Sequence, residues 1–401
     1  MFAPKPYMKF ITLTLLFAFL VDYVALGHGT ASAPPADESR KITFPDTVEY
    51  LTLVLDPHTH SVFSDGHVWP RIRVEEALRD GLDAMAITEH LEYQPHLEDI
   101  PHPDRNRSYE EADSAAKGSS LMVVPGAEIT RPAPASHMNA IFIRDANLLY
   151  QVPESTEPYE PKDFTQAAYE WPAQQAVEAA NKQGAFVFWN HAYWLRDFPT
   201  GIPVMPEFHR NNAKAGLLHG IEIANGQSYS EQTFQMALDY NLTLMGVSDV
   251  HQLVDWDYEP HKGGHRPVTL VLARERTPES MKEALFDRRT VVWFKNQLMG
   301  RPPHLGPLLE ASLSLRDASY GGELLKVSIT NVSDADFQLR NLSPYGFFSD
   351  TDLITVPQHG SKALQVKTGS KLGRIVLEFE VLNALTAPRQ TATLTLEAEV
   401  Q

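Results

Sequence analysis

The chain has 401 residues, of which 43% are hydrophobic and 21% are charged, and its formal net charge is -17. This ordinary globular composition allows one large domain and a smaller one, while the negative charge argues against nucleic acid or an anionic membrane surface as the main partner. The absence of cysteine excludes disulfides, thiolate metal sites and cysteine nucleophiles, so any metal must be held by His, Asp, Glu or backbone oxygen.

The N-terminal segment has the pattern of a secretory signal peptide. Lys5 and Lys9 precede an apolar run at residues 10–21, and Ala31-Ser32-Ala33 matches an A-x-A cleavage site. The run is short for a membrane span, and an uncleaved anchor is the alternative. We expect a signal peptide at residues 1–33, a linker rich in proline and charge at 34–48, and a periplasmic or secreted mature protein without further membrane contact.

From residue 49 onward, short apolar runs alternate with amphipathic helical stretches. The apolar runs predict strands at residues 51–55, 84–88, 121–124, 139–143, 185–189, 220–223, 244–247 and 268–272. The helical stretches lie at residues 74–79, 109–117, 174–183, 231–240 and 278–287. Alternating strands and helices indicate parallel βαβ units, and at this length a barrel of the (β/α) kind is the first choice.

The sequence pattern changes after Arg301-Pro302-Pro303. Residues 304–401 lack strong helical periodicity and contain alternating stretches, such as 324–329 and 391–400, separated by turn residues. We therefore predict a boundary near residue 303, followed by a small all-β domain of the β-sandwich kind.

Polar residues that can bind metal stand at the ends of the predicted strands. They are Asp56, His58 and His60, with Asp65 shortly after; Glu89 and His90; Glu128; His191; Glu222; and Asp249 and His251, while His137 opens a strand. The carboxyl ends of barrel strands converge, which is where barrel active sites form. Residues i and i+2 of a strand share a face, so the two histidines of an H-x-H step can bind one ion. Imidazole and carboxylate together suit zinc, iron and manganese.

A single histidine at a strand end is more often structural than a ligand, because isolated motif matches have a high false-positive rate. We interpret His96, His102, His209 and His219 in this way. The full set of strand-end residues is different, because each group follows its own strand and all of them fit one barrel.

The motifs Asp56-Pro57-His58-Thr59-His60, Thr88-Glu89-His90, Glu128, His137, His191 and Asp249-Val250-His251 resemble those of the PHP superfamily, named for polymerase and histidinol phosphatase domains. The resemblance covers about residues 51–294. We therefore assign residues 49–303 to a PHP-type domain. The resemblance implies a distorted (β/α)7 TIM-like barrel that acts on phosphoesters with two or three divalent ions, Mn2+, Zn2+ or Fe2+. An exported chain with a trailing β-domain is also similar to the bacterial organophosphate phosphodiesterase branch.

The resemblance also implies a role for each ligand. The first ion would be held by His58, His60, Glu128 and Asp249. Glu128 would bridge to a second ion, completed by His137 and His191. The third ion would be held by Asp65, His90 and His251. Some family members have His at the position of Asp65, and His67 is the alternative ligand there.

We expect the enzyme to hydrolyse small organic phosphate esters, with diesters preferred, by attack of a metal-bridging hydroxide on phosphorus. Arginines can bind the non-bridging oxygens, an imidazole can protonate the leaving group near neutral pH, and aromatic rings can pack against its organic part. The candidate general acids are His261 and His265, and the candidate substrate-binding residues are Arg196, Arg266, Trp194 and Tyr258.

Three alternatives remain open. The first is a phosphomonoesterase of the histidinol-phosphatase type. The second is a metal-dependent hydrolase of a non-phosphate bond, disfavoured because no lysine follows a strand end where a carboxylated bridging lysine is expected. The third is a non-enzymatic protein that stores metal or binds carbohydrate through its β-domain. Convergent ligand residues favour catalysis over the third alternative.

Overall fold

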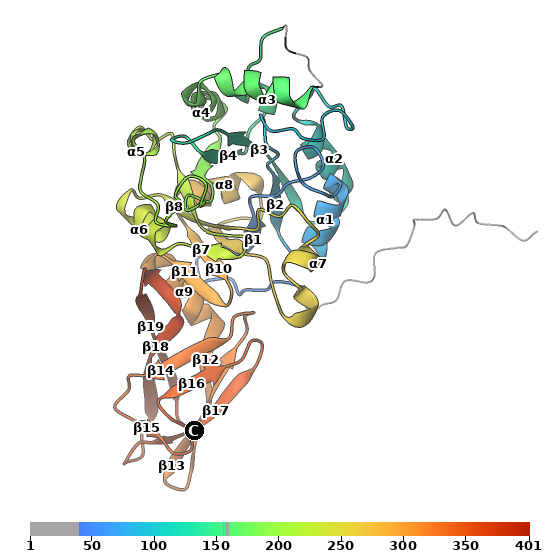
Figure 1. Ribbon diagram of the computed structural model, residues 1–401. Helices are drawn as coiled ribbons and strands as arrows, with labels where there is room; N and C mark the ends of the chain where they lie inside the picture. The colour runs from blue at the N-terminus through green and yellow to red at the C-terminus, as the bar shows by residue number, and fades with distance from the viewer. Residues whose placement is uncertain (1–39, 155, 157–159) are drawn as a thin grey trace, which may run out of the picture. The chain divides into compact units, whose positions relative to one another are not determined.

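The computed structural model describes residues 40–154, 156 and 160–401 (Figure 1). The predicted signal peptide lies outside the described residues, as does the first part of the predicted linker. In the part that is described, no helix is long and apolar enough to cross a membrane. The described residues of the linker include Ile42 and Phe44, which are buried in the core, and the Phe44 ring lies 5.2 Å from that of Trp293.

A curved, mixed sheet organises the N-terminal part of the chain. Its parallel pairs join β1 to β2, β2 to β3, β5 to β6 and β6 to β8. Five of these six strands are almost fully buried, whereas the first half of β3 is partly exposed, and all six are rich in apolar residues, as expected for strands of a covered sheet. Their bounds are Leu51–Asp56 (β1), Ala84–Ile87 (β2), Met122–Thr130 (β3), Phe186–Trp189 (β5), Gly220–Asn225 (β6) and Thr243–Val247 (β8).

Several strands of this sheet run against their neighbours, including the short β7 (Ser228–Tyr229), which is antiparallel to β6. Strand β4 (His137–Ile141) is antiparallel to β3 and β5, and β9 (Val268–Ala273) is antiparallel to β1 and to β10 (Thr290–Phe294). Only residues 131–136 separate β3 from β4, and a parallel pairing needs a crossover of a dozen or more residues. The expectation of uniformly parallel units is therefore wrong at these strands.

Helices surround the sheet (Figure 1). Two of them begin with a clear N-cap. At the start of α6, the Ser230 side chain accepts a hydrogen bond from the amide of Thr233. At the start of α8, the Thr277 side chain accepts one from the amide of Ser280, and Pro278 occupies the first helical position. The helices are α1 (Pro70–Arg79), α2 (Arg107–Ala116), α3 (Pro161–Glu170), α4 (Ala173–Lys182), α5 (Glu207–Lys214), α6 (Glu231–Asp239), α7 (Val254–Asp257) and α8 (Pro278–Phe286), with short 3-10 turns η2 (Ala146–Leu149) and η3 (Pro260–Lys262).

The chain just past β8 returns to the chain just past β1. The Asp249 amide donates to the carbonyl of His58 at 2.9 Å, and the His60 amide donates to that of Val250 at 3.2 Å. Gly246 of β8 allows close packing, because a Cβ there would lie 2.4 Å from a methyl of Val292. The two strand ends that carry H-x-H and D-x-H steps are thereby held side by side.

The rest of the chain forms an all-β domain after β11 (Gln297–Gly300) and α9 (Pro302–Ser312), which confirms a mixed α/β part followed by a β part. One sheet has the order β12-β13-β17-β15, and β16, β14, β18 and β19 continue the large sheet through the parallel pair β11–β18. The strands are β12 (Leu313–Gly321), β13 (Leu324–Asn331), β14 (Phe337–Asn341), β15 (Gly346–Phe347), β16 (Leu353–Val356), β17 (Ser361–Lys367), β18 (Arg374–Ala387) and β19 (Gln390–Glu399).

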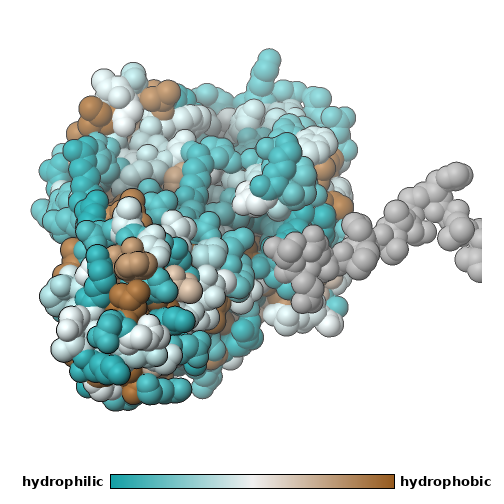
Figure 2. All heavy atoms as spheres, turned by 90° about the horizontal axis from the view of Figure 1, so that it is seen from below, coloured by the Kyte–Doolittle hydropathy of each residue, from teal (hydrophilic) through white to brown (hydrophobic). Residues whose placement is uncertain are grey.

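Alternating burial along these strands builds the second core. In β13, for example, Leu325, Val327 and Ile329 are buried while the residues between them are more exposed. Seen from below, hydrophobic residues lie in small groups among hydrophilic ones (Figure 2). The exposed large hydrophobic residues of this domain include Val332, Leu342, Phe348, Leu353 and Val376.

Candidate metal centre

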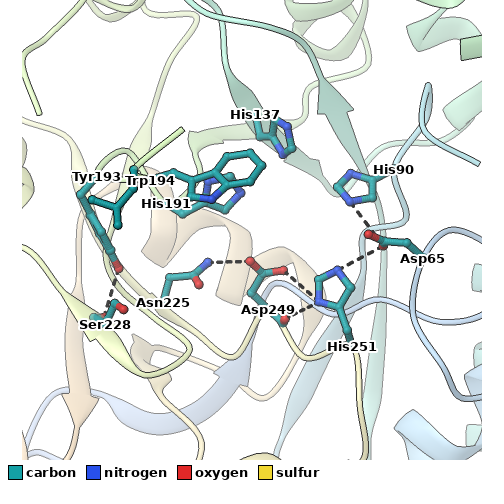
Figure 3. Close-up of a pocket in the computed structure, with 11 residues that line it drawn as sticks. Asp65, His90, His137, His191, Tyr193, Trp194, Asn225, Ser228, Asp249 and His251 are labelled. Atoms are coloured by element: carbon teal, nitrogen blue, oxygen red, sulfur yellow. Dashed lines mark hydrogen bonds and ion pairs between the residues drawn. The ribbon is translucent and has the colours of Figure 1, made fainter. Parts of the chain in front are cut away.

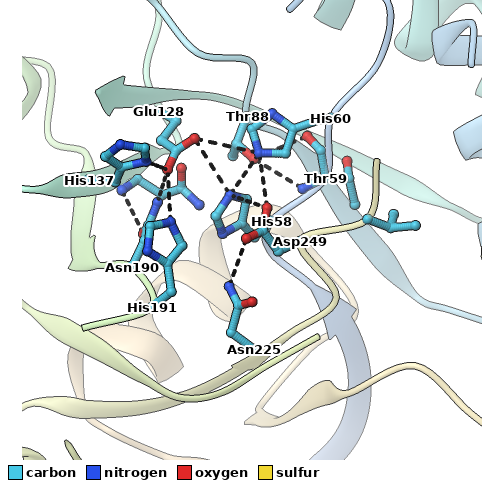
Figure 4. A network of polar contacts seen from close by, with 12 residues as sticks. His58, Thr59, His60, Thr88, Glu128, His137, Asn190, His191, Asn225 and Asp249 are labelled. Carbon is cyan, nitrogen blue, oxygen red and sulfur yellow. Dashed lines mark hydrogen bonds and ion pairs between the residues drawn. The ribbon is translucent and has the colours of Figure 1, made fainter. Parts of the chain in front are cut away.

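The structure brings the predicted ligands together at one rim of the sheet (Figures 3 and 4). They lie at or near the ends of six strands: three follow β1, two follow β8, and β2, β3, β4 and β5 contribute one each. The side chains of His58, His60 and Glu128 have no solvent exposure. The set is His58, His60, Asp65, His90, Glu128, His137, His191, Asp249 and His251, and within it three groups of possible ligand atoms lie within 4.8 Å of one another.

The first group has the spacing of ligands around one ion. The Nε2 atoms of His58 and His60 are 2.9 Å apart, and each is 3.1 Å from Oδ1 of Asp249. Glu128 Oε2 lies 3.5 Å from the His60 nitrogen and 3.8 Å from the His58 nitrogen. Ligands about 2.1 Å from a common ion are about 3.0–3.4 Å apart in octahedral or tetrahedral geometry. His58, His60 and Asp249 therefore have the spacing of ligands around a single divalent ion, and Glu128 lies slightly farther away.

Asp65 organises a second group. Its Oδ1 lies 3.1 Å from His251 Nε2, 3.4 Å from His90 Nε2 and 3.8 Å from His60 Nδ1. The alternative ligand, His67, is exposed and does not belong to any of the three groups. The structure thus places Asp65, and not His67, beside His90 and His251.

Glu128 lies between the groups. Its Oε1 is 3.0 Å from His137 Nδ1 and 3.6 Å from His191 Nε2, whereas its Oε2 faces His58 and His60. His90 also approaches Oε2, with its Nδ1 at 2.6 Å. The two oxygens of one carboxylate therefore face two different sets of imidazoles, which is the arrangement that a bridging ligand requires.

The buried polar atoms of the site fit divalent cations. Glu128 Oε2 and Asp65 Oδ1 are buried, and among the described residues their close contacts with imidazole nitrogens, such as those of His90 and His251, lack hydrogen-bond geometry. A buried carboxylate oxygen without a donor is costly unless a cation binds it. Two imidazole nitrogens facing each other, as in His58 and His60, are likewise expected where both lone pairs point to one ion.

Burial and the neighbouring charges shift the pKa values of the predicted ligands in different directions. Burial, together with the neighbouring His251 and His90, lowers the pKa of His60 to about 3, so the imidazole is neutral. Burial raises the pKa of Glu128, but His90 and His137 outweigh this effect and hold the pKa well below its usual range. Burial lowers the pKa of His251, but Asp65 and Asp249 raise it to about 8. Burial also lowers the pKa values of His58 and His90, but nearby carboxylates outweigh this effect and raise both pKa values well above their usual range. Because metal binds neutral imidazole and ionised carboxylate, a bound cation would displace protons from these histidines.

A pocket of about 450 Å³ opens onto the ligands. Figure 3 shows Trp194 and Tyr193 on one wall and Asp65, Asp249 and His251 on the other. Arg196 lies at this wall: its guanidinium stacks over the Trp194 ring at 3.8 Å, and its Nη2 is 3.2 Å from His137 Nε2. The structure therefore brings two of the predicted substrate-binding residues, Arg196 and Trp194, to the site.

The other two predicted substrate-binding residues lie elsewhere. Arg266 is 1% exposed, and its guanidinium pairs with Asp56 at 3.1 Å and with Asp80 at 2.6 Å, so it has no free face for a phosphate. Tyr258 is buried, and its hydroxyl donates to the carbonyl of Ser248 at 2.7 Å. Both predictions are corrected: these side chains support the backbone under the site and do not line the pocket.

The two predicted general acids do not line the pocket either. His265 stacks on Trp293, with ring centroids 3.4 Å apart and planes 4° from parallel, and burial lowers its pKa to about 4. His261 is exposed on η3. The stacking of His265 follows from the pairing of β9 with β10, which places the residues before β9 beside Trp293.

Several residues around the ligands received no role from the sequence. Asn190 donates to Glu128 Oε1 at 2.8 Å, and Asn225 donates to Asp249 Oδ2 at 3.0 Å (Figure 4). Glu222 is fully buried and contacts His58. The sequence places these residues at the ends of predicted strands. It does not reveal their hydrogen-bond partners, because those partners come from other strands.

Comparisons with known proteins agree with this site. A family described as an Ig-like domain matches residues 313–397, and no curated protein matches the chain. A crystal structure from Bacteroides vulgatus, of a two-domain protein containing a predicted PHP-like metal-dependent phosphoesterase, is 36% identical with a TM-score of 0.80. The match covers 91% of this chain and 100% of the relative.

Fold and site together define a two-domain metal-dependent hydrolase, an α/β part with a cluster of His, Asp and Glu joined to an Ig-like domain. The chain belongs to the PHP-like metal-dependent phosphoesterase family. Two more distant structures also match. One is a protein from Bifidobacterium adolescentis named as a metal-dependent phosphoesterase, which is 20% identical with a TM-score of 0.37 and covers 51% of this chain and 89% of that one. The other is an amidohydrolase from Chromobacterium violaceum, which is 16% identical with a TM-score of 0.34 and covers 49% of this chain and 87% of that one. Likeness at this level carries no argument about function.

Proposed function

We propose that the protein is a phosphodiesterase that hydrolyses small organic phosphate esters and prefers diesters to monoesters. The observation that carries the proposal is the position of Glu128, whose two carboxylate oxygens face two sets of imidazoles at the floor of the pocket. Adjacent cations bridged by one carboxylate suit in-line displacement at phosphorus, because the attacking and the leaving oxygen are stabilised together.

We propose that the chain binds two or three divalent ions. The first would be held by His58, His60, Asp249 and Glu128, the second by Glu128, His137 and His191, and the third by Asp65, His90 and His251. When bound, manganese, zinc or iron(II) supplies Lewis-acid stabilisation of the phosphoryl oxygens and makes a nearby water more acidic. The distorted (β/α)7 barrel belongs to this proposal, and the bridge between Thr59 and Val250 that joins the ends of β1 and β8 supports it.

The wall of the pocket supports the preference for diesters. Arg196 is held over Trp194 and can bind a non-bridging phosphate oxygen. Trp194 and Leu195 expose apolar surface that can accept the second organic group of a diester. A diester has one negative charge where a monoester has up to two, so a protein with a net charge of -17 repels it less.

In this proposal neither His261 nor His265 protonates the leaving group, because both lie outside the pocket lining. Phenols are far better leaving groups than alkyl alcohols without protonation, and we expect aryl diesters to be the better substrates.

We also propose that the protein is exported to the periplasm or secreted. The pattern of Lys5, Lys9, the apolar run at residues 10–21 and Ala31-Ser32-Ala33 supports this proposal. Mass spectrometry of the protein from its native host should find an N-terminus shortly after Ala33, and a full-length cytoplasmic product would contradict the proposal.

Steady-state kinetics on a matched aryl phosphate monoester, diester and anilide test the function. Chelated protein should be inactive and regain diester hydrolysis with a divalent transition metal. His58→Ala should lose it, whereas the control His359→Ala, an exposed histidine of the β-domain, should keep it. A larger kcat/KM for the monoester would favour the histidinol-phosphatase alternative. Hydrolysis of the anilide alone would favour the non-phosphate alternative.

A further inference from the structure

A buried carboxylate outside the three ligand groups contacts residues of two of the predicted ion sites. Glu222 of β6 has no solvent exposure, and its Oε1 lies 2.7 Å from Nδ1 of His58. Its Oε2 accepts hydrogen bonds from the backbone amide of His191 at 2.5 Å and from Nδ2 of Asn225 at 2.8 Å. One carboxylate thus joins residues that follow β1 and β5 to the end of β6.

We propose that Glu222 is a positioning residue that fixes the tautomer of His58 and ties together the ligands of two ions, so that metal affinity depends on its charge. This inference rests on the proposed metal centre. It adds a residue that binds no ion itself but sets the affinity of those that do.

The His58 contact determines which ring nitrogen is free. When Nδ1–H donates to Glu222 Oε1, the lone pair of Nε2 is left pointing toward His60 Nε2 and Asp249 Oδ1. A ligand histidine generally donates its second N–H to a carboxylate or carbonyl, which sets the ring orientation and raises its basicity. Glu222 provides this partner for the first ion.

The second oxygen of Glu222 holds two other parts of the site. His191 has a φ of 23°, a left-handed conformation that is strained for a residue with a side chain, and its amide is held by Glu222. This conformation lets the His191 ring approach Glu128. Asn225, which also donates to Glu222, donates to Oδ2 of Asp249, as Figure 4 shows. Loss of Glu222 would therefore disturb ligands of both ions.

The strand itself aims Glu222 at the site. The pairing of β6 with β8 shifts register between Glu222 and Ala224, a β-bulge that leaves Ile223 unpaired. Bulges occur next to active sites, where they re-aim a side chain. The bulge places Glu222 and Asn225 at the same rim, one beneath His58 and the other beside Asp249.

Glutamine is a sharp test of this arrangement, because Glu222 faces three donors: His58 Nδ1–H, the His191 amide and the Asn225 amide group. A carboxylate offers two acceptor oxygens, whereas Gln offers one oxygen and an NH2 group. In Glu222→Gln the NH2 group either faces the two donors or faces His58. If the NH2 group faces His58, the imidazole proton moves to Nε2, and a proton on Nε2 blocks the binding of the first ion.

The experiment measures metal binding. Chelated wild type and Glu222→Gln are titrated with Mn2+ and with Zn2+ by calorimetry, and the unfolding free energy of each metal-free protein is measured in urea. We expect affinity about 10–100-fold weaker in Glu222→Gln, typical for loss of such a partner. The matched control is Glu92→Gln, a fully buried glutamate bonded to the Thr130 amide and Arg131 and to none of the predicted ligands. It should bind metal as wild type does.

A double-mutant cycle separates positioning from general destabilisation. In a His58→Ala background, Glu222→Gln should cause a smaller further loss of affinity, because the tautomer effect acts through His58. Equal affinity in Glu222→Gln and wild type, or fully additive losses in the cycle, would overturn the proposal. If Glu222→Gln does not fold, Glu222→Asp, which keeps the charge but shortens the reach to His58, should still weaken binding.

The outcomes also distinguish this inference from the proposed function. A wild type that binds ions with Glu222-dependent affinity but hydrolyses no phosphoester would overturn the function and leave the inference standing. A wild type that binds no divalent ion would overturn both.

Discussion

Arg266 provides a direct test of the structure against the sequence-based prediction, which placed it on the substrate. In the structure its side chain and that of Asp56 have no exposure, and the side chain of Asp80 is 4% exposed. Burial lowers the pKa of Arg266, but Asp80 and Asp56 outweigh it and raise the pKa above its usual value. We therefore expect Arg266→Met to reduce stability and not to act selectively on turnover.

The contacts of Arg266 determine how much stability Arg266→Met should lose. Breaking a buried ion pair by removing one partner costs about 3–5 kcal/mol. Asp80 keeps a second cation, because Arg40 Nε lies 2.5 Å from it. Among the described residues, the Asp56 side chain keeps only the hydrogen bond from the Ser248 amide at 3.1 Å. One carboxylate, not two, is left without a cation. We expect a loss near the lower end, about 3 kcal/mol, and a fall in Tm of about 5 °C or more.

The assay is urea unfolding of metal-free protein, combined with kcat/KM per mole of folded, metal-loaded enzyme. The control is Arg196→Met, whose side chain is 51% exposed: its unfolding free energy should change by no more than about 0.5 kcal/mol, while its kcat/KM for the diester falls. Adding Asp56→Asn to Arg266→Met should restore part of the lost stability, because no unpaired charge is then buried. Wild-type stability in Arg266→Met together with a selective loss of kcat/KM would refute the reasoning.

Two further predictions concern Glu128 and Glu92. Glu128→Ala should reduce kcat/KM more than any other single ligand change, and adding His58→Ala should reduce it little further, because the ligands act as a unit; additive losses in kinetics would contradict this. Burial raises the pKa of Glu92 from 4.5 to about 7, so its stabilising contribution is present below pH 4.5 and is lost as the pH rises to 7. Urea unfolding across this range should show a steeper decline for wild type than for Glu92→Gln, and parallel curves would exclude the effect.

The sequence predicted most of the residues that the structure brings together at the rim of the sheet. The ligands follow apolar strands, and the carboxyl ends of neighbouring parallel strands meet at one rim whatever the details of packing. His58 and His60 share a face because side chains alternate along an extended chain. The alternating residues of the C-terminal part likewise define an all-β domain, since each strand has one buried face.

Tertiary structure alone decided which residues surround these ligands. His137 opens its strand, and it reaches the same rim as the ends of β3 and β5 only because β4 runs antiparallel to both. Arg196 and Arg266 look alike in the sequence, but one stacks on Trp194 at the pocket and the other is enclosed by two carboxylates from distant segments. The partners of Glu222 come from three strand ends. Strand direction and long-range pairing depend on how the whole sheet closes, and a local sequence pattern does not contain that information.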